Sequence, residues 1–299
     1  MNSHHFDDVI VKSVFETCVA AGIDYMEIGY RASRKGVRTG EHGCWKYCPE
    51  EDIRRIVGDN PTPLKISIMA DAGKCEYRED IPKKESSIVD LIRVACYLHQ
   101  IPLALDMVQD AHDKGYETTI NLMAVTTAEE RELDAGLEML ASSEAGVIYL
   151  VDSFGALTPR HTVHLARKYL NYAAFGGKEV GMHAHNNLLL AFSNTVEAAS
   201  LGVNYLDATM AGLGRGAGNC PMELLLGFLD NTRYRLHPVL QCVDEVIEPM
   251  RKDLKWGFDL PYMITGLFNH HPRAAIAFNA TNSRGDIREF YDAAVHGEG

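Results

Sequence analysis

Seven short apolar runs, each followed by a segment of helical length, constrain this chain more than any other feature of its sequence. They are "YMEIGYR" (25–31), "LKISIMA" (64–70), "VDLIRVACY" (89–97), "TTINLMAV" (118–125), "GVIYLVDS" (146–153), "EVGMHAHN" (179–186) and "VNYLDATMAG" (203–212). Several of the intervening segments end at glycine, as helices commonly do. Regular strand–helix alternation predicts an α/β fold with a parallel sheet and right-handed crossovers.

The number of strands narrows the architecture. A doubly wound sheet can stop at any strand, whereas a TIM (β/α)8 barrel needs eight strands in about 250 residues. The chain opens directly on a predicted helix, 6–22, as if it followed a missing first strand. We therefore expect a TIM (β/α)8-type barrel over residues 1–235, with seven strands visible and the first one missing. Residues 236–299 are predicted to form a helical extension packed on that barrel.

Composition limits the partners and the compartment. The chain has 41 acidic and 29 basic residues, a formal net charge of −12, and no basic stripe, which argues against nucleic acid. No apolar stretch approaches the roughly 20 residues that span a bilayer, and the N-terminal "MNSHHFDD" lacks a signal-peptide pattern. We expect a cytoplasmic protein that binds a small molecule, without a membrane partner.

The seven cysteines support the same compartment. Their number is odd and their spacing is not that of a disulfide framework, which favours reduced thiols. Cys44 and Cys48 form the one close pair, but a structural zinc ion would need two more ligands, and only Cys75 and His42 lie near in sequence. Loop thiols are the better interpretation.

The most informative stretch is "GMHAHNNLLL", residues 181–190, which places His183 and His185 one residue apart. In a strand, residues i and i+2 point to the same face, so these imidazoles would project together. Neutral imidazoles bind first-row divalent ions, and barrel enzymes keep their active sites at the C-terminal ends of the strands. This context favours a metal site over a pair of hydrogen-bonded buried histidines.

A glycine-rich segment, "AGLGRGAGNCPMELL" (211–225), follows the last run. Gly212, Gly214 and Ala217 satisfy the dinucleotide-binding pattern G-x-G-x-x-[GA], but no second strand ending in an acidic residue follows. We instead predict a flexible loop that brings Asn219 and backbone amides over the site. A turn-rich connection without chemistry is the alternative.

Polar residues also mark two other strands. Asp152 and Ser153 would point to opposite faces, so Ser153 is the candidate donor to a substrate carboxylate or carbonyl, while Asp152 would cap the next helix. Glu27 is a carboxylate on an otherwise apolar strand, where burial would require a partner. It is either a site residue or the acid of a salt bridge to Arg31 or Arg93.

Together these stretches resemble the DRE-TIM metallolyases, a superfamily of metal-dependent aldolases and Claisen lyases, and within it the 4-hydroxy-2-oxovalerate aldolases. The resemblance covers nearly the whole chain and is strongest over residues 181–226, from the H-x-H strand to the glycine-rich loop. It implies that His183, His185 and Asn219 bind Mn²⁺ or Mg²⁺.

The resemblance also implies a reaction. Ser153 would contact a pyruvate moiety, and Tyr262, in "LPYMITGLF", falls near the family's C-terminal tyrosine. A metal ion that chelates a 2-oxo acid would stabilise the enolate formed when the C3–C4 bond breaks. We therefore expect an aldolase that cleaves or forms a 4-hydroxy-2-oxo acid, with pyruvate and an aldehyde as the other reaction partners.

Two alternatives stay open. One is a Claisen-type synthase or lyase of the same superfamily that acts on acyl-CoA, although the short C-terminal tail favours the aldolase. The other is a catalytically silent barrel with a docking role, because aldolases of this family can associate with an aldehyde dehydrogenase. Whichever function is correct, we expect a homo-oligomer.

The family's R-D-G motif, which supplies an aspartate ligand and an arginine from the first strand, has no match in this chain. His4 and His5 follow the position where the R-D-G motif would stand, and we assign the family's catalytic histidine to neither of them. Either the chain is shortened at its N-terminus, which we favour, or it takes a third ligand from elsewhere, with Glu27 the first candidate. A missing strand would also expose two sheet edges, which predicts poor solubility or a dimer.

Overall fold

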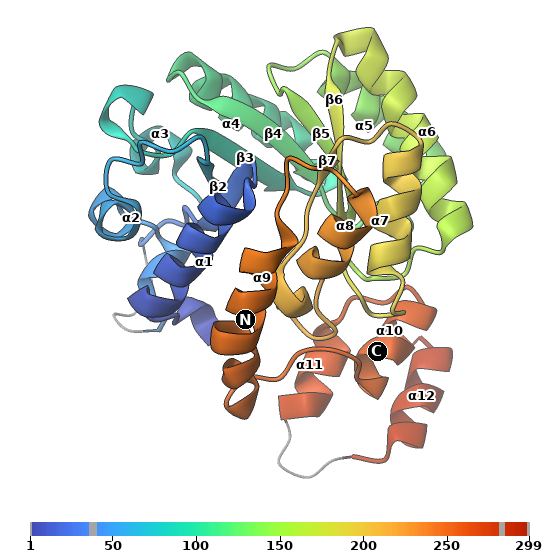
Figure 1. Ribbon diagram of the computed structural model, residues 1–299. Helices are drawn as coiled ribbons and strands as arrows, with labels where there is room; N and C mark the ends of the chain where they lie inside the picture. Colours follow the sequence, from blue (N-terminus) through green and yellow to red (C-terminus); the bar gives the residue numbers. More distant parts are fainter. Residues whose placement is uncertain (1, 36–40, 281–284, 298–299) are drawn as a thin grey trace.

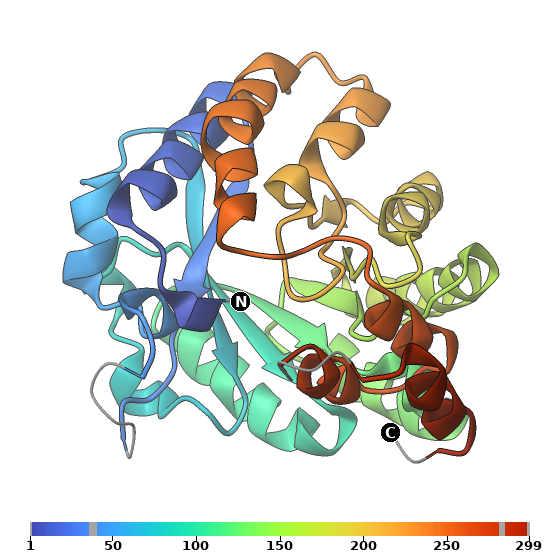
Figure 2. The ribbon, with the colours of Figure 1, turned by 90° about the horizontal axis from the view of Figure 1, so that it is seen from below.

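The computed structural model describes residues 2–35, 41–280 and 285–297. Seven parallel strands form one sheet in chain order, which confirms the predicted α/β architecture and its strand count. The strands are β1 (Tyr25–Tyr30), β2 (Lys65–Asp71), β3 (Leu91–Cys96), β4 (Glu117–Leu122), β5 (Val147–Asp152), β6 (Glu179–Ala184) and β7 (Tyr205–Leu206). The sheet curls into an incomplete TIM-type barrel with helices outside it (Figures 1 and 2).

The helices fall into two groups. Those that follow the alternation are α1 (Asp8–Ala21), α2 (Glu50–Val57), the short α3 (Tyr77–Asp80), α4 (Ile101–Asp113), α5 (Glu130–Ala141), α6 (Pro159–Gly176), α7 (Ala191–Ser200) and α8 (Met222–Leu229). The C-terminal helices are α9 (Leu236–Cys242), α10 (Leu260–Leu267), α11 (Arg273–Ala280) and α12 (Ile287–Val295). The last three lie together at one end of the molecule (Figure 1). No helix in the described ranges is long and apolar enough to cross a membrane.

Helix α1 forms within the predicted helical segment 6–22. The buried residues are Val11, Phe15, Cys18 and Ala21, which follow one another at intervals of three or four and so form one helical stripe. Val9 lies outside this stripe and is 75% exposed. The helix ends at Gly22, whose φ of 75° is the left-handed conformation that glycine adopts without strain.

Strand β7 is much shorter than the predicted run 203–212. Beyond it the backbone leaves the sheet, because Thr209 bonds to residues that follow the glycine-rich loop. The amide of Thr209 donates to the Cys220 carbonyl at 2.9 Å, and the amide of Met222 donates to the Thr209 carbonyl at 2.9 Å. These bonds pull the segment over the end of the barrel, so the strand prediction was wrong beyond the short β7.

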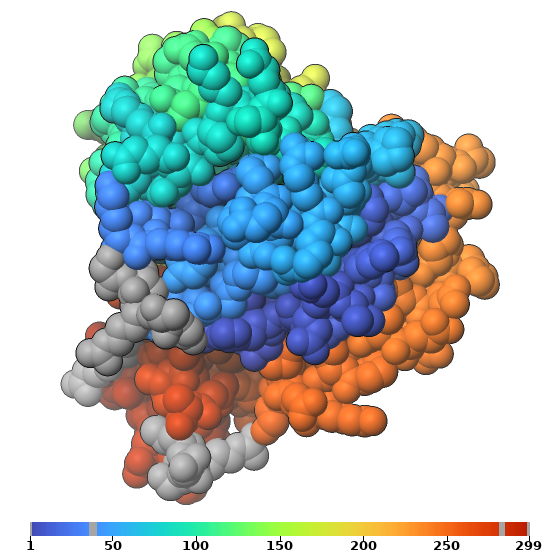
Figure 3. Space-filling model, turned by 90° about the vertical axis from the view of Figure 1, so that its left-hand side faces the viewer, coloured from blue at the N-terminus to red at the C-terminus, as the bar shows by residue number. Residues whose placement is uncertain are grey.

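The two ends of the sheet do not meet. Among the described residues β1 pairs only with β2, and β7 only with β6. Helices cover the outside of this gap, since α1 packs against α9 and the Arg235 amide donates to the Ala21 carbonyl at 2.9 Å. Figure 3 shows the dark blue surface near the N-terminus directly against the orange surface of the region around α9. The consequence for solubility or dimerisation stays a prediction.

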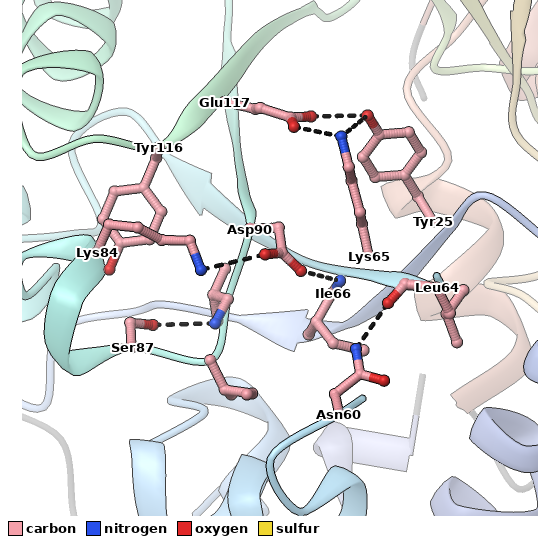
Figure 4. A network of polar contacts seen from close by, with 12 residues as sticks. Tyr25, Asn60, Leu64, Lys65, Ile66, Lys84, Ser87, Asp90, Tyr116 and Glu117 are labelled. Carbon is pink, nitrogen blue, oxygen red and sulfur yellow. Dashed lines mark hydrogen bonds and ion pairs between the residues drawn. The ribbon is translucent and has the colours of Figure 1, made fainter. Parts of the chain in front are cut away.

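A polar cluster holds the strands together at their N-terminal ends (Figure 4). The hydroxyl of Tyr25 on β1 donates to Glu117 on β4 at 2.7 Å, and Lys65 on β2 pairs with the same carboxylate. Asp90 accepts from the Ile66 amide at 2.9 Å. Polar contacts at this end of a barrel serve stability, which leaves the opposite end for function.

Gly181 on β6 makes room inside the barrel for the Tyr149 ring. A β-carbon on Gly181 would lie 2.5 Å from that ring. We therefore expect Gly181→Ala to lower the free energy of unfolding by about 1–3 kcal/mol, because overpacking a filled interior forces neighbours to move. Urea denaturation measures this.

The matched control is Gly146→Ala, where the nearest atom would be 3.6 Å from the added carbon. We expect it to change stability by less than about 0.5 kcal/mol. Equal effects of the two substitutions would contradict the steric explanation.

Candidate active site

Strand β6 ends with the two predicted histidines side by side. Met182 and Ala184 are buried against the helices, so His183 and His185 project to the other side of the strand. Their ring centroids lie 5.1 Å apart at an interplanar angle of 80°. The sequence spacing therefore brings the two imidazoles together at the C-terminal end of the strand, as expected.

His183 is oriented by a carboxylate. Its Nδ1 lies 2.9 Å from Asp207 Oδ2, just beyond β7. Burial alone would raise the pKa of Asp207, but the Arg93 guanidinium and the His183 hydrogen bond lower it to about 2. An ionised carboxylate only accepts, so His183 Nδ1 carries the proton of this hydrogen bond and donates it to Asp207.

Arg93, on β3, lies at the centre of this network. Its Nη2 donates to Asp207 Oδ2 at 2.6 Å and its Nη1 donates to Glu27 Oε2 at 2.8 Å, while the guanidinium stands 4.5 Å from the Tyr149 ring centroid. The sequence left Arg31 and Arg93 as possible partners of Glu27, and the structure selects Arg93. Arg31 pairs with Glu50 at 2.8 Å. Burial raises the pKa of Glu27 despite its neighbour Arg93.

The glycine-rich loop folds directly onto His185. His185 and Asn219 form an isolated antiparallel bridge, and the Asn186 amide donates to the Gly218 carbonyl at 2.9 Å. Asn219 Nδ2 donates to the Leu213 carbonyl at 3.3 Å, whereas Asn219 Oδ1 and His185 Nδ1 are buried without a partner in the described structure. Burial lowers the pKa of His185 well below its usual value, helped by nearby Arg215 and His183. His185 is therefore a neutral imidazole beside an unsatisfied amide oxygen.

The two asparagines after His185 have structural partners instead. Asn186 Oδ1 accepts from the Ala191 amide at 3.1 Å, at the start of α7. Asn187 Nδ2 donates to the Tyr262 carbonyl at 3.1 Å and so ties the end of β6 to α10. They position the site and leave its chemistry to the histidines.

Tyr262, on α10, packs against the same glycine-rich loop. A β-carbon on Gly216 would lie 2.4 Å from the Tyr262 ring, so the phenol packs directly on the loop backbone. The Gly257 amide donates to the Gly216 carbonyl at 3.0 Å, and Trp256 Nε1 donates to the Ala211 carbonyl at 2.9 Å. Burial raises the pKa of Tyr262. The C-terminal segment thus holds the loop over the barrel end.

Ser153 lies at the end of the neighbouring strand β5. Its Oγ accepts from the Ala124 amide at 2.9 Å, and its carbonyl accepts from Arg215 Nη2 at 3.0 Å. Since Oγ accepts in this contact, its own proton is available for a ligand.

The prediction that Asp152 caps the next helix is wrong. Its carboxylate accepts from the amides of Ala156 and Leu157 at 2.9 and 3.2 Å and so holds the loop before α6. The N-cap of α6 is Thr158, whose hydroxyl accepts from His161. Burial raises the pKa of Asp152 to about 6, although the hydrogen bonds from these backbone amides lower it.

Sequence reasoning missed three charged residues of the site. Asp207 lies in a run predicted as a strand and Arg215 in the glycine-rich segment, and neither was predicted as a site residue, while Arg93 was predicted only as a possible partner of Glu27. A parity argument would have found Arg93, because Leu91, Arg93 and Ala95 share one face of β3. No sequence signal places Arg215 beside His185, because that contact depends on how the loop folds.

The chemistry of the donors partly fits the divalent ion that the resemblance implies. In the described part of the chain no three or more His, Cys, Asp or Glu residues are grouped to hold a metal. The available donors are His183 Nε2, a ring nitrogen of His185 and Asn219 Oδ1, and none of them is a carboxylate oxygen. These donors could supply part of the coordination shell of a divalent ion. A hard ion would require further oxygen ligands from substrate or water.

The fold and the site together define a TIM-type barrel protein with paired histidines at the end of its sixth visible strand. The HMGL-like family model matches residues 96–244. Oxaloacetate decarboxylase from Mycobacterium tuberculosis is 31% identical over 261 residues, which cover 85% of this chain and 72% of that protein. The chain belongs to the HMGL-like family, and the predicted DRE-TIM resemblance is confirmed.

Other relatives agree. A 4-hydroxy-2-oxovalerate aldolase from Bacillus cereus is 29% identical over 291 residues, covering 92% of this chain and 82% of that protein. The structure of the N-terminal domain of a proposed aldolase from Bacteroides vulgatus aligns with this chain with a TM-score of 0.76 at 26% identity. The alignment covers 95% of this chain and 94% of that domain. HMG-CoA lyase from Bacillus subtilis shares the fold, with a TM-score of 0.65 at 16% identity. The alignment covers 82% of this chain and 88% of the lyase chain. The names of the relatives confirm the prediction of a carbon–carbon lyase family.

We expect Arg93→Met to lower the free energy of unfolding by roughly 3 kcal/mol, because it leaves Glu27 and Asp207 without their cation. Urea denaturation of the variant measures the loss. Adding Glu27→Gln and Asp207→Asn should recover part of it, since the triple variant no longer contains the unpaired charges.

The control is Arg54→Met, which removes an exposed pair with Asp59 and should cost less than about 1 kcal/mol. If Arg93→Met is no more damaging than this control, the interior network does not stabilise the barrel.

Proposed function

We propose that this chain is a divalent-metal-dependent aldolase that cleaves or forms a 4-hydroxy-2-oxo acid. One observation carries the proposal: two adjacent imidazoles lie at the end of β6, and Asn219, which forms a backbone bridge with His185, has a buried amide oxygen without a partner in the described structure. The names of several relatives, among them the Bacillus cereus aldolase, support the reaction class. Pyruvate and an aldehyde would be the products of cleavage.

In this proposal His183, His185 and Asn219 hold the ion, Mn²⁺ or Mg²⁺. Bound there, the ion supplies Lewis-acid stabilisation of the enolate that forms when the C3–C4 bond breaks. Asp207 keeps the proton of His183 on Nδ1, and the neutral state of His185 keeps a lone pair available.

Two hydroxyl groups of the chain would contact the substrate. Ser153 Oγ can donate to a carboxylate or keto oxygen, because its own acceptor site already receives the Ala124 amide. Tyr262 keeps its proton at neutral pH, since burial raises its pKa, and it therefore acts as a donor to oxygen and not as a base. Glu27, the third residue singled out in the sequence, acts through Arg93 as the support of Asp207.

Decarboxylation of a 2-oxo dicarboxylic acid is a second candidate activity. A relative with 31% identity is named oxaloacetate decarboxylase. Loss of carbon dioxide from such a substrate breaks the same C3–C4 bond and leaves the same pyruvate enolate, so one site serves both reactions. The Claisen-type reaction, the docking role, the aldehyde dehydrogenase partner and the homo-oligomer have no such observation behind them and stay predictions.

We expect this chain to bind Mn²⁺ through the histidine pair. Electron paramagnetic resonance should show that His183→Ala and His185→Ala each weaken binding by about tenfold or more, because each removes one of three protein donors. Asn219→Asp should strengthen binding, since hard ions prefer carboxylate oxygen. His161→Ala, an exposed histidine on α6, is the control and should bind as the wild type does. Unchanged binding in both site variants would refute the metal assignment.

We also expect metal-dependent release of pyruvate from 4-hydroxy-2-oxovalerate or from oxaloacetate. A coupled lactate dehydrogenase assay would follow it, with free Mn²⁺ alone as the background for oxaloacetate. A chelator should abolish the enzymatic rate, and His183→Ala should lower it about 100-fold or more, because the charge that stabilises the enolate is lost. The absence of metal-dependent release from both substrates would reject the proposed function.

A further inference from the structure

Arg215 is a cation without an acidic partner at the barrel end. Its contacts among the described residues are the Ser153 carbonyl, 3.0 Å from Nη2, and His185 Nε2, 3.5 Å from the same atom. The two arginines that are buried in the described structure are compensated: Arg31 by Glu50, and Arg93 by Glu27 and Asp207. Within the described structure, no carboxylate forms an ion pair with Arg215.

The loop backbone fixes where this guanidinium lies. A β-carbon on Gly214 would fall 2.5 Å from Asn219 Nδ2, and one on Gly216 would fall 2.4 Å from the Tyr262 ring. The backbone of Arg215 is therefore held between a proposed metal ligand and the tyrosine that closes the site. Its side chain then reaches Ser153 and His185, at the ends of β5 and β6.

The surroundings favour an anionic ligand. Burial lowers the pKa of Arg215, and only the phenols of Tyr262, Tyr30 and Tyr97 oppose this shift. An arginine keeps its charge in proteins, so a partly desolvated guanidinium without a carboxylate is stabilised when an anion binds. Nε and Nη1 make no hydrogen bond to the described residues and are available as donors.

We propose that Arg215 binds the carboxylate of the 2-oxo acid substrate. A guanidinium forms strong charge-assisted hydrogen bonds with a carboxylate, and the contact with Ser153 places Arg215 beside the hydroxyl proposed to touch the same moiety. The inference rests on the proposed 2-oxo acid chemistry. It adds that the Arg215 guanidinium makes the enzyme prefer a 2-oxo acid substrate over a neutral ketone. Arg215 is thus a substrate-binding residue that neither the histidine pair nor the glycine pattern reveals.

Binding of pyruvate and of its neutral amide, pyruvamide, tests the assignment. Isothermal titration calorimetry would be done with Mn²⁺ present on the wild type, Arg215→Met and Arg215→Lys. We expect Arg215→Met to weaken pyruvate binding by about tenfold or more, the range of a lost charge-assisted hydrogen bond, and to leave pyruvamide binding unchanged. The pyruvate affinity of Arg215→Lys, which keeps the charge, should lie between the affinities of the wild type and of Arg215→Met.

Arg160→Met on α6 is the matched control, because Arg160 is exposed and its side chain forms no ion pair or hydrogen bond with a site residue in the described structure. It should bind pyruvate as the wild type does. Equal pyruvate affinity in Arg215→Met and the wild type would overturn the inference, and so would an equal loss for pyruvamide, which would indicate a structural role. A loss seen only with oxaloacetate would assign Arg215 to the second carboxylate of a dicarboxylic acid and would also overturn it.

Labelling of the wild-type protein tests the same contact without a variant. Phenylglyoxal modifies accessible arginines, and mass spectrometry of the peptides would compare Arg215 with Arg160. Pyruvate should slow modification of Arg215 and not of Arg160, and failure of any 2-oxo acid to protect Arg215 would reject the assignment.

The two proposals fail separately. Protection of Arg215 by pyruvate without metal-dependent cleavage of any 4-hydroxy-2-oxo acid would reject the aldolase and support the carboxylate site. Cleavage without protection would support the aldolase and reject the role of Arg215. Mn²⁺ binding to Arg215→Met, followed by electron paramagnetic resonance, should not be weakened, because His183, His185 and Asn219 keep their donor atoms and the variant only removes a positive charge next to His185.

Discussion

The ion pairs of Arg93 connect parts of the barrel that the sheet does not. β1 and β7 are not paired in the described structure, yet Arg93 on β3 binds Glu27 on β1 and Asp207 just beyond β7. Asp207 in turn fixes the ring of His183. One buried guanidinium therefore stabilises the open side of the barrel and sets which nitrogen of the first candidate metal ligand faces outward.

The other half of the site depends on close backbone packing. The glycine-rich loop bonds to the end of β6 on one side and is covered by the segment around Tyr262 on the other. Trp256 and Gly257 add hydrogen bonds to the loop backbone. Part of the region predicted as a helical extension thus contributes directly to the site, because its contacts hold Asn219 and Arg215 in place.

The two arginines of the site illustrate opposite uses of one side chain. Arg93 has two carboxylate partners and serves as a structural cation, whereas Arg215 has none in the described structure and is the one that a substrate anion can satisfy. Removal of Arg93 affects stability because it leaves charges unpaired. Removal of Arg215 relieves an uncompensated charge, so its main effect falls on ligand binding.

The sequence by itself determined the α/β class, the seven strands and the convergence of His183 with His185, because these follow from local periodicity along one strand or helix. Only the tertiary structure decided that Glu27 pairs with Arg93, that β7 stops after two residues and that Asp152 holds a loop. It also decided that Arg215 reaches His185. These features depend on contacts between residues far apart in the chain, and no local pattern specifies which distant partner a charged side chain or a loop backbone will meet.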